Sequence, residues 1–158
     1  MAHWLFKTEP DAFSIVDLVA RPDQSEFWDG VRNYQARNFL RDLVAVGDDV
    51  LIYHSSCKNV GIAGLAKVVQ SPSPDPTQFD PKSNYFDPES PQKQPRWYGV
   101  VIQHVETFPE VLALKTIKLM PGIVELPLVN KGHRLSIMPV NSEEFTLLTV
   151  TARGKTSG

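Results

Sequence analysis

The chain has almost no cysteine and no grouping of histidines. Cys57 is the only cysteine in 158 residues, so no disulfide can form within the chain. One cysteine cannot build a structural zinc site, and the four histidines lack metal-ligand spacing. The glycines form neither a dinucleotide-binding fingerprint nor a phosphate-binding loop. We therefore expect no metal and no cofactor.

Long apolar runs are also missing. No stretch approaches the roughly 20 apolar residues of a membrane-spanning helix, so we expect no membrane partner. Lys7 and Glu9 interrupt the region where a secretion signal needs an uninterrupted apolar segment. A cytoplasmic protein is the resulting expectation, with the nucleus left open.

An excess of positive charge is absent as well. The net charge is −2, from 16 Lys and Arg against 18 Asp and Glu. Proteins that coat a nucleic-acid backbone need a surplus of cations, so this balance excludes that binding mode. It leaves room for a small site that reads one base with a few local cations.

The sequence also lacks a recognisable catalytic constellation. The run from His54 to Cys57 places a base beside three nucleophiles, and a hydrolase that uses His54 or Cys57 is one alternative. Adjacent residues of a strand point to opposite faces, however, so His54 should not meet Ser55. There is no Gly-x-Ser-x-Gly elbow either. We therefore expect a protein that is not an enzyme.

Proline is plentiful, with 13 prolines against nine glycines. Seven of them fall in residues 71–95, where Phe-Asp-Pro occurs twice, at 79–81 and at 86–88. The repeated Phe predicts two anchors of an ordered loop, and an ordered loop of this length is usually functional. A cover over a site, a passive flap and a protein-interaction scaffold are the alternatives for this loop.

The order of strand and turn signals predicts an α+β domain. Strands are expected over residues 3–9, 49–55, 60–69, 96–108 and 134–138, and Gly61 and Gly64 within the third of these indicate a bulge or a close approach by another group. A capping box of Ser14 and Asp17 is expected to open a short helix that runs to about Ala20. Further short helices are expected over 34–43 and after Asn141, and a short helix or turn over 114–120. Hairpins dominate and no regular β-α-β rhythm appears, so a doubly wound parallel sheet is not expected. We predict one domain over residues 1–150 and a disordered tail over 151–158.

Recognition chemistry is concentrated in residues 28–41, which read WDGVRNYQARNFLR. Asp29-Gly30 predicts a turn, and Asn33 is the expected N-cap of a helix that begins at Tyr34. That helix has an apolar stripe that should pack on a core, formed by Ala36, Phe39, Leu40 and Leu43. The loop before this helix is where we expect a flat, polar ligand.

A nucleobase is the leading candidate for that ligand. A single base in a pocket is recognised by aromatic stacking and by hydrogen bonds along its edge, and stacking contributes roughly 1–3 kcal/mol per base. The candidate planes are Trp28, Tyr34 and Trp97, although both tryptophans could equally be core residues. The candidate donors and acceptors are Asn33, Asn38, His54, Ser55 and Ser56. Phosphates at the rim could meet Arg32, Arg37, Arg41, Lys58 or Arg134.

Eight short motifs, in order along the chain, resemble those of the EVE domain family. They are WLFKTEP at 4–10, WDGVRNYQARNFLR at 28–41, YHSSC at 53–57, VGIAG at 60–64, FDP at 79–81, YFDP at 85–88, PRW at 95–97 and RLS at 134–136. Each motif is weak alone, but the ordered set is specific and covers the chain from near residue 1 to about residue 150.

This resemblance implies a PUA-like fold, a mixed β-barrel with peripheral short helices. EVE domains are similar to YTH domains, which hold a methylated adenine of RNA in an aromatic cage, and EVE domains are thought to bind modified bases in DNA or RNA. Carried over by position, the pocket consists of Trp28, Asn33, Tyr34, His54 and Ser55. Secondary candidates are Lys7, Ser56, Trp97, Arg134 and Ser136. The resemblance thus implies a non-catalytic domain whose partner is a nucleic acid, DNA or RNA, with a modified base.

Overall fold

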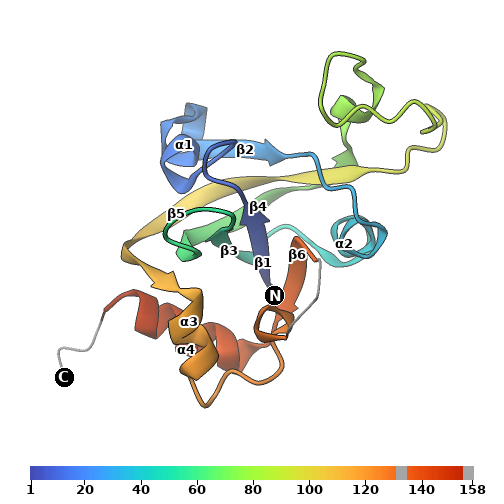
Figure 1. Ribbon diagram of the computed structural model, residues 1–158. Coiled ribbons are helices and arrows are strands. Elements are labelled where there is room, and N and C mark those ends of the chain that lie inside the picture. The colour runs from blue at the N-terminus through green and yellow to red at the C-terminus, as the bar shows by residue number, and fades with distance from the viewer. Residues whose placement is uncertain (131–134, 155–158) are drawn as a thin grey trace.

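The computed structural model describes residues 1–130 and 135–154, and it is built on one six-stranded sheet (Figure 1). The strand order is β2-β5-β4-β3-β1-β6, where β1 is parallel to β3 and every other pairing is antiparallel. The strands are β1 (His3–Thr8), β2 (Ser25–Trp28), β3 (Asp49–His54), β4 (Gly61–Pro74), β5 (Tyr98–Ala113) and β6 (Ile137–Val140). The predicted α+β class with a mixed sheet is confirmed. Within the described residues β2 and β6 are free edges, so the sheet is not closed into a barrel.

Short helices surround this sheet, as predicted. They are α1 (Ile15–Ala20), α2 (Tyr34–Asn38), α3 (Leu114–Leu119) and α4 (Ser142–Ala152), with a π-helical turn over Phe39–Leu43 and 3-10 turns at Pro22–Gln24, Pro76–Phe79 and Pro127–Val129. The predicted capping box opens α1, since the Asp17 amide donates to Ser14 Oγ and the Ser14 amide donates to Asp17 Oδ2. Within the described part of the chain, no helix has the length and apolarity that crossing a membrane requires.

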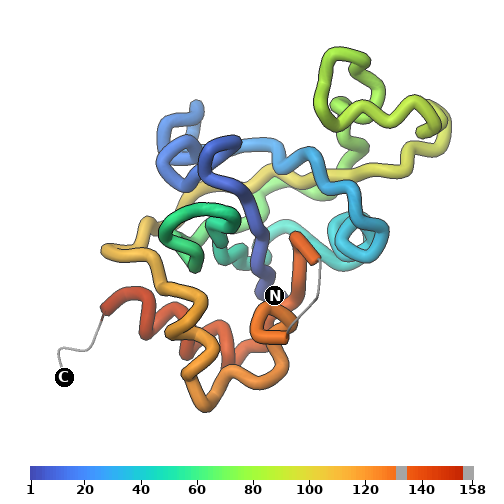
Figure 2. The backbone as a smooth tube through the Cα atoms, in the orientation of Figure 1, coloured from blue at the N-terminus to red at the C-terminus, as the bar shows by residue number. Residues whose placement is uncertain are grey.

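Both faces of the sheet are buried because alternate residues of its central strands are apolar on both sides. In β1, Trp4 and Phe6 enter one hydrophobic cluster and Leu5 enters the other. The first cluster includes Trp28 and the residues under α1 and α2, and the second lies under α3 and α4. The long strands β4 and β5 carry residues 75–97 between them, at the end of the molecule away from α3 and α4 (Figures 1 and 2).

The helix after Asn33 ends differently from the prediction. The Val44 amide donates to the Phe39 carbonyl oxygen, which closes a π-helical turn with one extra residue. That residue shifts the apolar face, so Leu43 is 60% exposed and Val44 takes the buried position. The predicted stripe is therefore correct for Ala36 and Leu40 and wrong for Leu43.

Two strands also depart from the sequence prediction. Residues 25–28 were not predicted as a strand but form edge strand β2 against β5. The last strand begins at Ile137, so Leu135 and Ser136 lie outside it, and it includes Pro139, which an edge strand tolerates because one side of its backbone has no strand partner among the described residues. The predicted domain boundary at residue 150 falls inside α4. Beyond it, the Arg153 guanidinium donates from Nε and Nη2 to the Glu106 carboxylate.

Candidate functional site

A pocket of about 530 Å³ opens where the ends of β1 and β2 meet the proline-rich loop. It is lined by residues 7–9, 12–13, 21, 26–31, 55, 85 and 135–136. This volume lies in the range of small-molecule sites, roughly 300–1,000 Å³. The lining comes from seven separate stretches of the chain, so the pocket exists only in the folded protein.

Trp28 forms part of the pocket wall and is also a core residue. Only 7% of it is exposed, and its ring lies 5.6 Å from the Phe6 ring and 5.9 Å edge-on from the Phe13 ring, measured between centroids. The interpretation of Trp28 as a core residue is therefore confirmed, and its role as a base plane stays a prediction. Most of the ring is committed to packing, so Trp28 stabilises the wall more than it offers a free face.

Tyr85 supplies an aromatic wall that the sequence did not single out. Its side chain lines the pocket, and the residue is 41% exposed. Its ring lies directly over Gly30, where an added Cβ would sit 2.6–2.9 Å from three ring carbons. Gly30 also has a φ of +78°, which favours glycine. The predicted Asp29-Gly30 turn thus serves a second purpose, because it leaves room for an aromatic ring from a distant loop.

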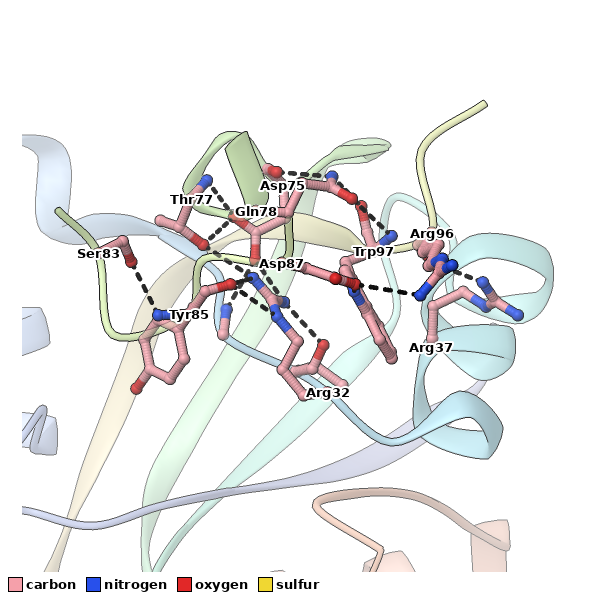
Figure 3. Close-up of polar contacts among 12 residues, drawn as sticks. Arg32, Arg37, Asp75, Thr77, Gln78, Ser83, Tyr85, Asp87, Arg96 and Trp97 are labelled. Carbon is pink, nitrogen blue, oxygen red and sulfur yellow. Dashed lines mark hydrogen bonds and ion pairs between the residues drawn. The ribbon is translucent and has the colours of Figure 1, made fainter. Parts of the chain in front are cut away.

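Arg32 holds the Tyr85 loop in place (Figure 3). Its guanidinium donates to the Tyr85 carbonyl oxygen from Nε and Nη2, at 3.1 and 2.7 Å, and to Asp75 Oδ2 from Nη1, at 3.0 Å. Asp75 is fully buried and also accepts from the amides of Gly30 and Thr77. Arg32 was expected to bind phosphate at the rim, but its guanidinium is bonded to Tyr85 and Asp75 within the protein. We call this set of bonds the Arg32 clasp.

The other anchors of the loop are polar, not aromatic. Gln78 is fully buried, and its amide group bonds the carbonyl oxygens of Asp75 and Trp97 and the Ser90 hydroxyl. Phe86, expected as an anchor, is 38% exposed. The loop is ordered by hydrogen bonds between its two ends, and so the prediction of an ordered segment is confirmed with different anchors.

Tyr34 and Trp97 lie outside the pocket because they stack on each other. Their ring centroids are 4.8 Å apart with an interplanar angle of 26°. The Arg37 guanidinium lies 4.9 Å from the Tyr34 ring and that of Arg32 lies 5.2 Å from the Trp97 ring. Trp97 also donates from Nε1 to Asp87 Oδ2 at 2.7 Å. These two predicted base planes instead form a cation–π ladder that joins α2 to the loop.

Asn33 and His54 also have structural partners. Asn33 caps α2 as predicted, its Oδ1 accepting from the Ala36 amide at 2.9 Å, and it does not line the pocket. His54 is buried, and its Nε2 accepts from the Ile15 amide at 3.1 Å. An Nε2 acceptor fixes the neutral tautomer with its proton on Nδ1. Because Nε2 is occupied by the main chain, it is not a free base for Cys57 or the neighbouring serines.

Acid should weaken the fold through His54. Burial lowers the pKa of His54 below its ordinary 6.5, with a smaller opposing effect of the Asp17 charge. When a group has a lower pKa in the folded state than in the unfolded state, it contributes stability at pH values above its unfolded-state pKa. That contribution is lost as the pH falls to the folded-state pKa. We expect the free energy of unfolding to fall from pH 6.5 downward, and to fall less steeply in His54→Gln, in urea titrations at several pH values. Identical slopes for the two proteins would contradict the buried neutral His54.

The remaining predicted residues divide between the pocket and other sites. Ser55, Lys7 and Ser136 line the pocket, whereas Ser56 does not. Arg37 donates to the Arg96 carbonyl oxygen, and Arg41 pairs with Asp42. Lys58 borders a separate hollow together with Glu110 and Lys115. Arg134 lies outside the described residues.

Three charged residues of the lining, Lys7, Glu9 and Asp29, form no ion pair with a described residue. The Nζ atom of Lys7 lies 5.7 Å from the Tyr53 ring centroid, and burial lowers the pKa of Lys7. Asp29 was noticed only as a turn residue, yet it lines the pocket. Burial raises the pKa of Asp29, as do the nearby charges of Asp75 and Glu26, while Arg32 opposes them. The pocket therefore combines apolar walls and hydroxyls with two cations, Lys7 and Arg21, and three carboxyl groups, those of Glu9, Glu26 and Asp29.

The EVE domain family matches residues 2–150, nearly the whole chain. The chain belongs to the EVE domain family. This EVE domain is 41% identical over 160 residues to thymocyte nuclear protein 1 of Homo sapiens, an alignment that covers 91% of this chain and 71% of that protein. The family resemblance inferred from the eight motifs is confirmed.

Solved structures show the same fold. A Pseudomonas syringae protein is 46% identical to this EVE domain with a TM-score of 0.91, over 96% of this chain and 99% of that one. Human THYN1, solved in complex with 5-methylcytosine-containing DNA, is 40% identical with a TM-score of 0.87, over 96% of this chain and 98% of that one.

Proposed function

We propose that this EVE domain is a non-catalytic DNA-binding module that holds a modified nucleobase, 5-methylcytosine in the first place, in the pocket beside Trp28. The observation that carries the proposal is the likeness to human THYN1, which was solved with 5-methylcytosine-containing DNA. The pocket has the volume of a small-molecule site, and a base turned out of the helix is a ligand of that class.

The pocket supplies the interactions that a single base needs. Tyr85 offers an aromatic ring, and stacking is worth roughly 1–3 kcal/mol per base. Phe13 and Phe27 add apolar surface against which a methyl group can pack. Lys7, Ser55 and Ser136 add hydrogen-bonding groups along the wall. With a net charge of −2, affinity has to come from this local site.

Two other functions have less support. The hydrolase alternative requires His54 as a base, but His54 accepts from the Ile15 amide and, like Cys57, does not line the pocket. The scaffold alternative requires a loop available to partners, but the loop is bound to Arg32 and contributes Tyr85 to the pocket.

Tyr85→Ala tests the proposal without disturbing the core. We expect wild type to bind a duplex with one 5-methylcytosine more tightly than the same duplex with cytosine. Tyr85→Ala should weaken binding by roughly 5- to 150-fold, the equivalent of losing 1–3 kcal/mol of stacking. Fluorescence anisotropy titration with labelled oligonucleotides measures both effects.

Phe86→Ala is the matched control, because Phe86 is the next residue, is similarly exposed and does not line the pocket. Its affinity should equal that of wild type. Equal losses in both variants, or no binding by wild type, would contradict the proposal. Trp28→Ala is a poorer test, since removing a Trp that is 7% exposed damages the core.

A further inference from the structure

Two acidic residues of the pocket lining, Glu9 and Asp29, have no side-chain hydrogen bond or ion pair with another described residue, and Asp29 is the one that joins Trp28 to Gly30 beside the Tyr85 ring. Glu26, which also lines the pocket, accepts from Arg21 Nε at 3.0 Å. Asp75, beneath the turn, is saturated by Gly30, Arg32 and Thr77. Among the described residues, the carboxyl group of Asp29 accepts a hydrogen bond only from its own main-chain amide. Its carboxyl oxygens are therefore available to a ligand.

The backbone on both sides of Asp29 is fixed. Trp28 precedes it in β2, where it pairs with Val100 and packs on Phe6 and Phe13. Gly30 follows it, and its amide donates to buried Asp75 at 2.8 Å. An acceptor held by a rigid backbone costs little ordering entropy when it binds, which is the condition for specific recognition.

The charges around Asp29 decide which ligand groups it can meet. Asp75 and Glu26 both act on its carboxyl group with negative charge, and the positive charge of Arg32 opposes each of them with a smaller effect. A phosphate would be repelled here, whereas an N–H donor would be attracted. Among base edges, the exocyclic amino groups of cytosine and adenine are such donors, and carboxylates are known to accept from cytosine N4. Thymine and uracil present a carbonyl oxygen at the corresponding position.

We propose that Asp29 reads the base edge in this pocket by accepting a hydrogen bond from an exocyclic amino group, so that the site takes amino-bearing bases and rejects thymine and uracil. The inference rests on the proposed function and assigns it a specificity-determining residue. A thymine in the same position sets its O4 against the carboxyl oxygen, leaving two acceptors without a proton between them.

The sharpest test compares 5-methylcytosine with thymine, since both carry the 5-methyl group and they differ along the hydrogen-bonding edge. Each base is placed opposite an abasic site in one duplex, so that no base pair has to be broken. We expect wild type to bind the 5-methylcytosine duplex about 10- to 100-fold more tightly than the thymine duplex. Asp29→Asn should lose most of this preference, because the amide can donate to O4 as well as accept.

Asp11→Asn is the control, because it removes one exposed acidic charge next to the pocket without touching its lining. It should keep the wild-type preference. An Asp29→Asn variant that also keeps it, or that weakens both duplexes by one common factor, would overturn the role of Asp29.

The test separates this inference from the proposed function. If wild type binds both duplexes equally and Tyr85→Ala still weakens that binding, the role of Asp29 is overturned and the proposed function stands. No wild-type binding to either duplex would overturn both. Unchanged melting temperatures of Asp29→Asn and Asp11→Asn establish that a loss of preference is not a loss of fold.

Discussion

Asp75→Ala should lower the free energy of unfolding by roughly 3 kcal/mol, the lower end of the range for breaking a buried ion pair. Asp75 is 0% exposed and accepts from Gly30, Thr77 and Arg32, so its removal leaves two main-chain amides and a guanidinium without their partner. The lower end applies because the Arg32 side chain remains 22% exposed and can recover some hydration. Urea denaturation followed by tryptophan fluorescence measures the change.

Asp80→Ala is the matched control in the same loop. Asp80 is exposed and its side chain accepts only from the Lys82 amide among described residues, so its loss should cost about 1 kcal/mol or less. Asp75→Ala should also weaken DNA binding, because Tyr85 is held by the same arginine. A midpoint equal to that of Asp80→Ala would show that the clasp does not stabilise the loop.

Gly61→Ala should have a comparable effect at the other end of β4. A Cβ at this position would lie 2.1 Å from the Leu112 carbonyl oxygen, which belongs to the backbone of β5 and cannot rotate away. Strands β4 and β5 must separate to admit it, so we expect a loss on the order of 3 kcal/mol, the upper part of the range for overpacking. For a chain of this size the melting temperature should fall by about 6–12 °C.

Gly47→Ala separates crowding from backbone conformation. Gly47 has a φ of +95° but nothing within 4 Å of an added Cβ, so only the conformational cost of about 1–2 kcal/mol remains. Differential scanning calorimetry of the two variants gives the comparison. Equal melting temperatures would refute the close approach between Gly61 and β5.

Features set by neighbouring residues were predictable from the sequence. The Ser14 capping box and the Asn33 N-cap each join groups three residues apart, and both were correctly placed. Gly61 inside a strand indicated a close approach by another group, which is the carbonyl of Leu112. The strand predicted over residues 3–9 is β1. In each case the partner is nearby in sequence or the signal is a missing side chain.

The candidate site was less predictable because its contacts join distant segments. Tyr34 is a residue type that can stack on a base. Its sequence neighbourhood does not show that the ring of Trp97, far along the chain, stacks on it instead. Tyr85 and Asp29 carry ordinary loop and turn signals, and only the folded chain brings them to one pocket. The sequence around His54 likewise does not distinguish it from a ligand-binding histidine, because its partner, the Ile15 amide, lies on a distant segment.

The Arg32 clasp has a practical consequence for altering the ligand. Arg32 holds residue 85 by its carbonyl oxygen, a group that every amino acid possesses. The side chain at position 85 can thus be exchanged while the loop stays fastened. A library at this single position, built on an unchanged scaffold, is therefore the most economical starting point for engineering EVE domains with new base preferences.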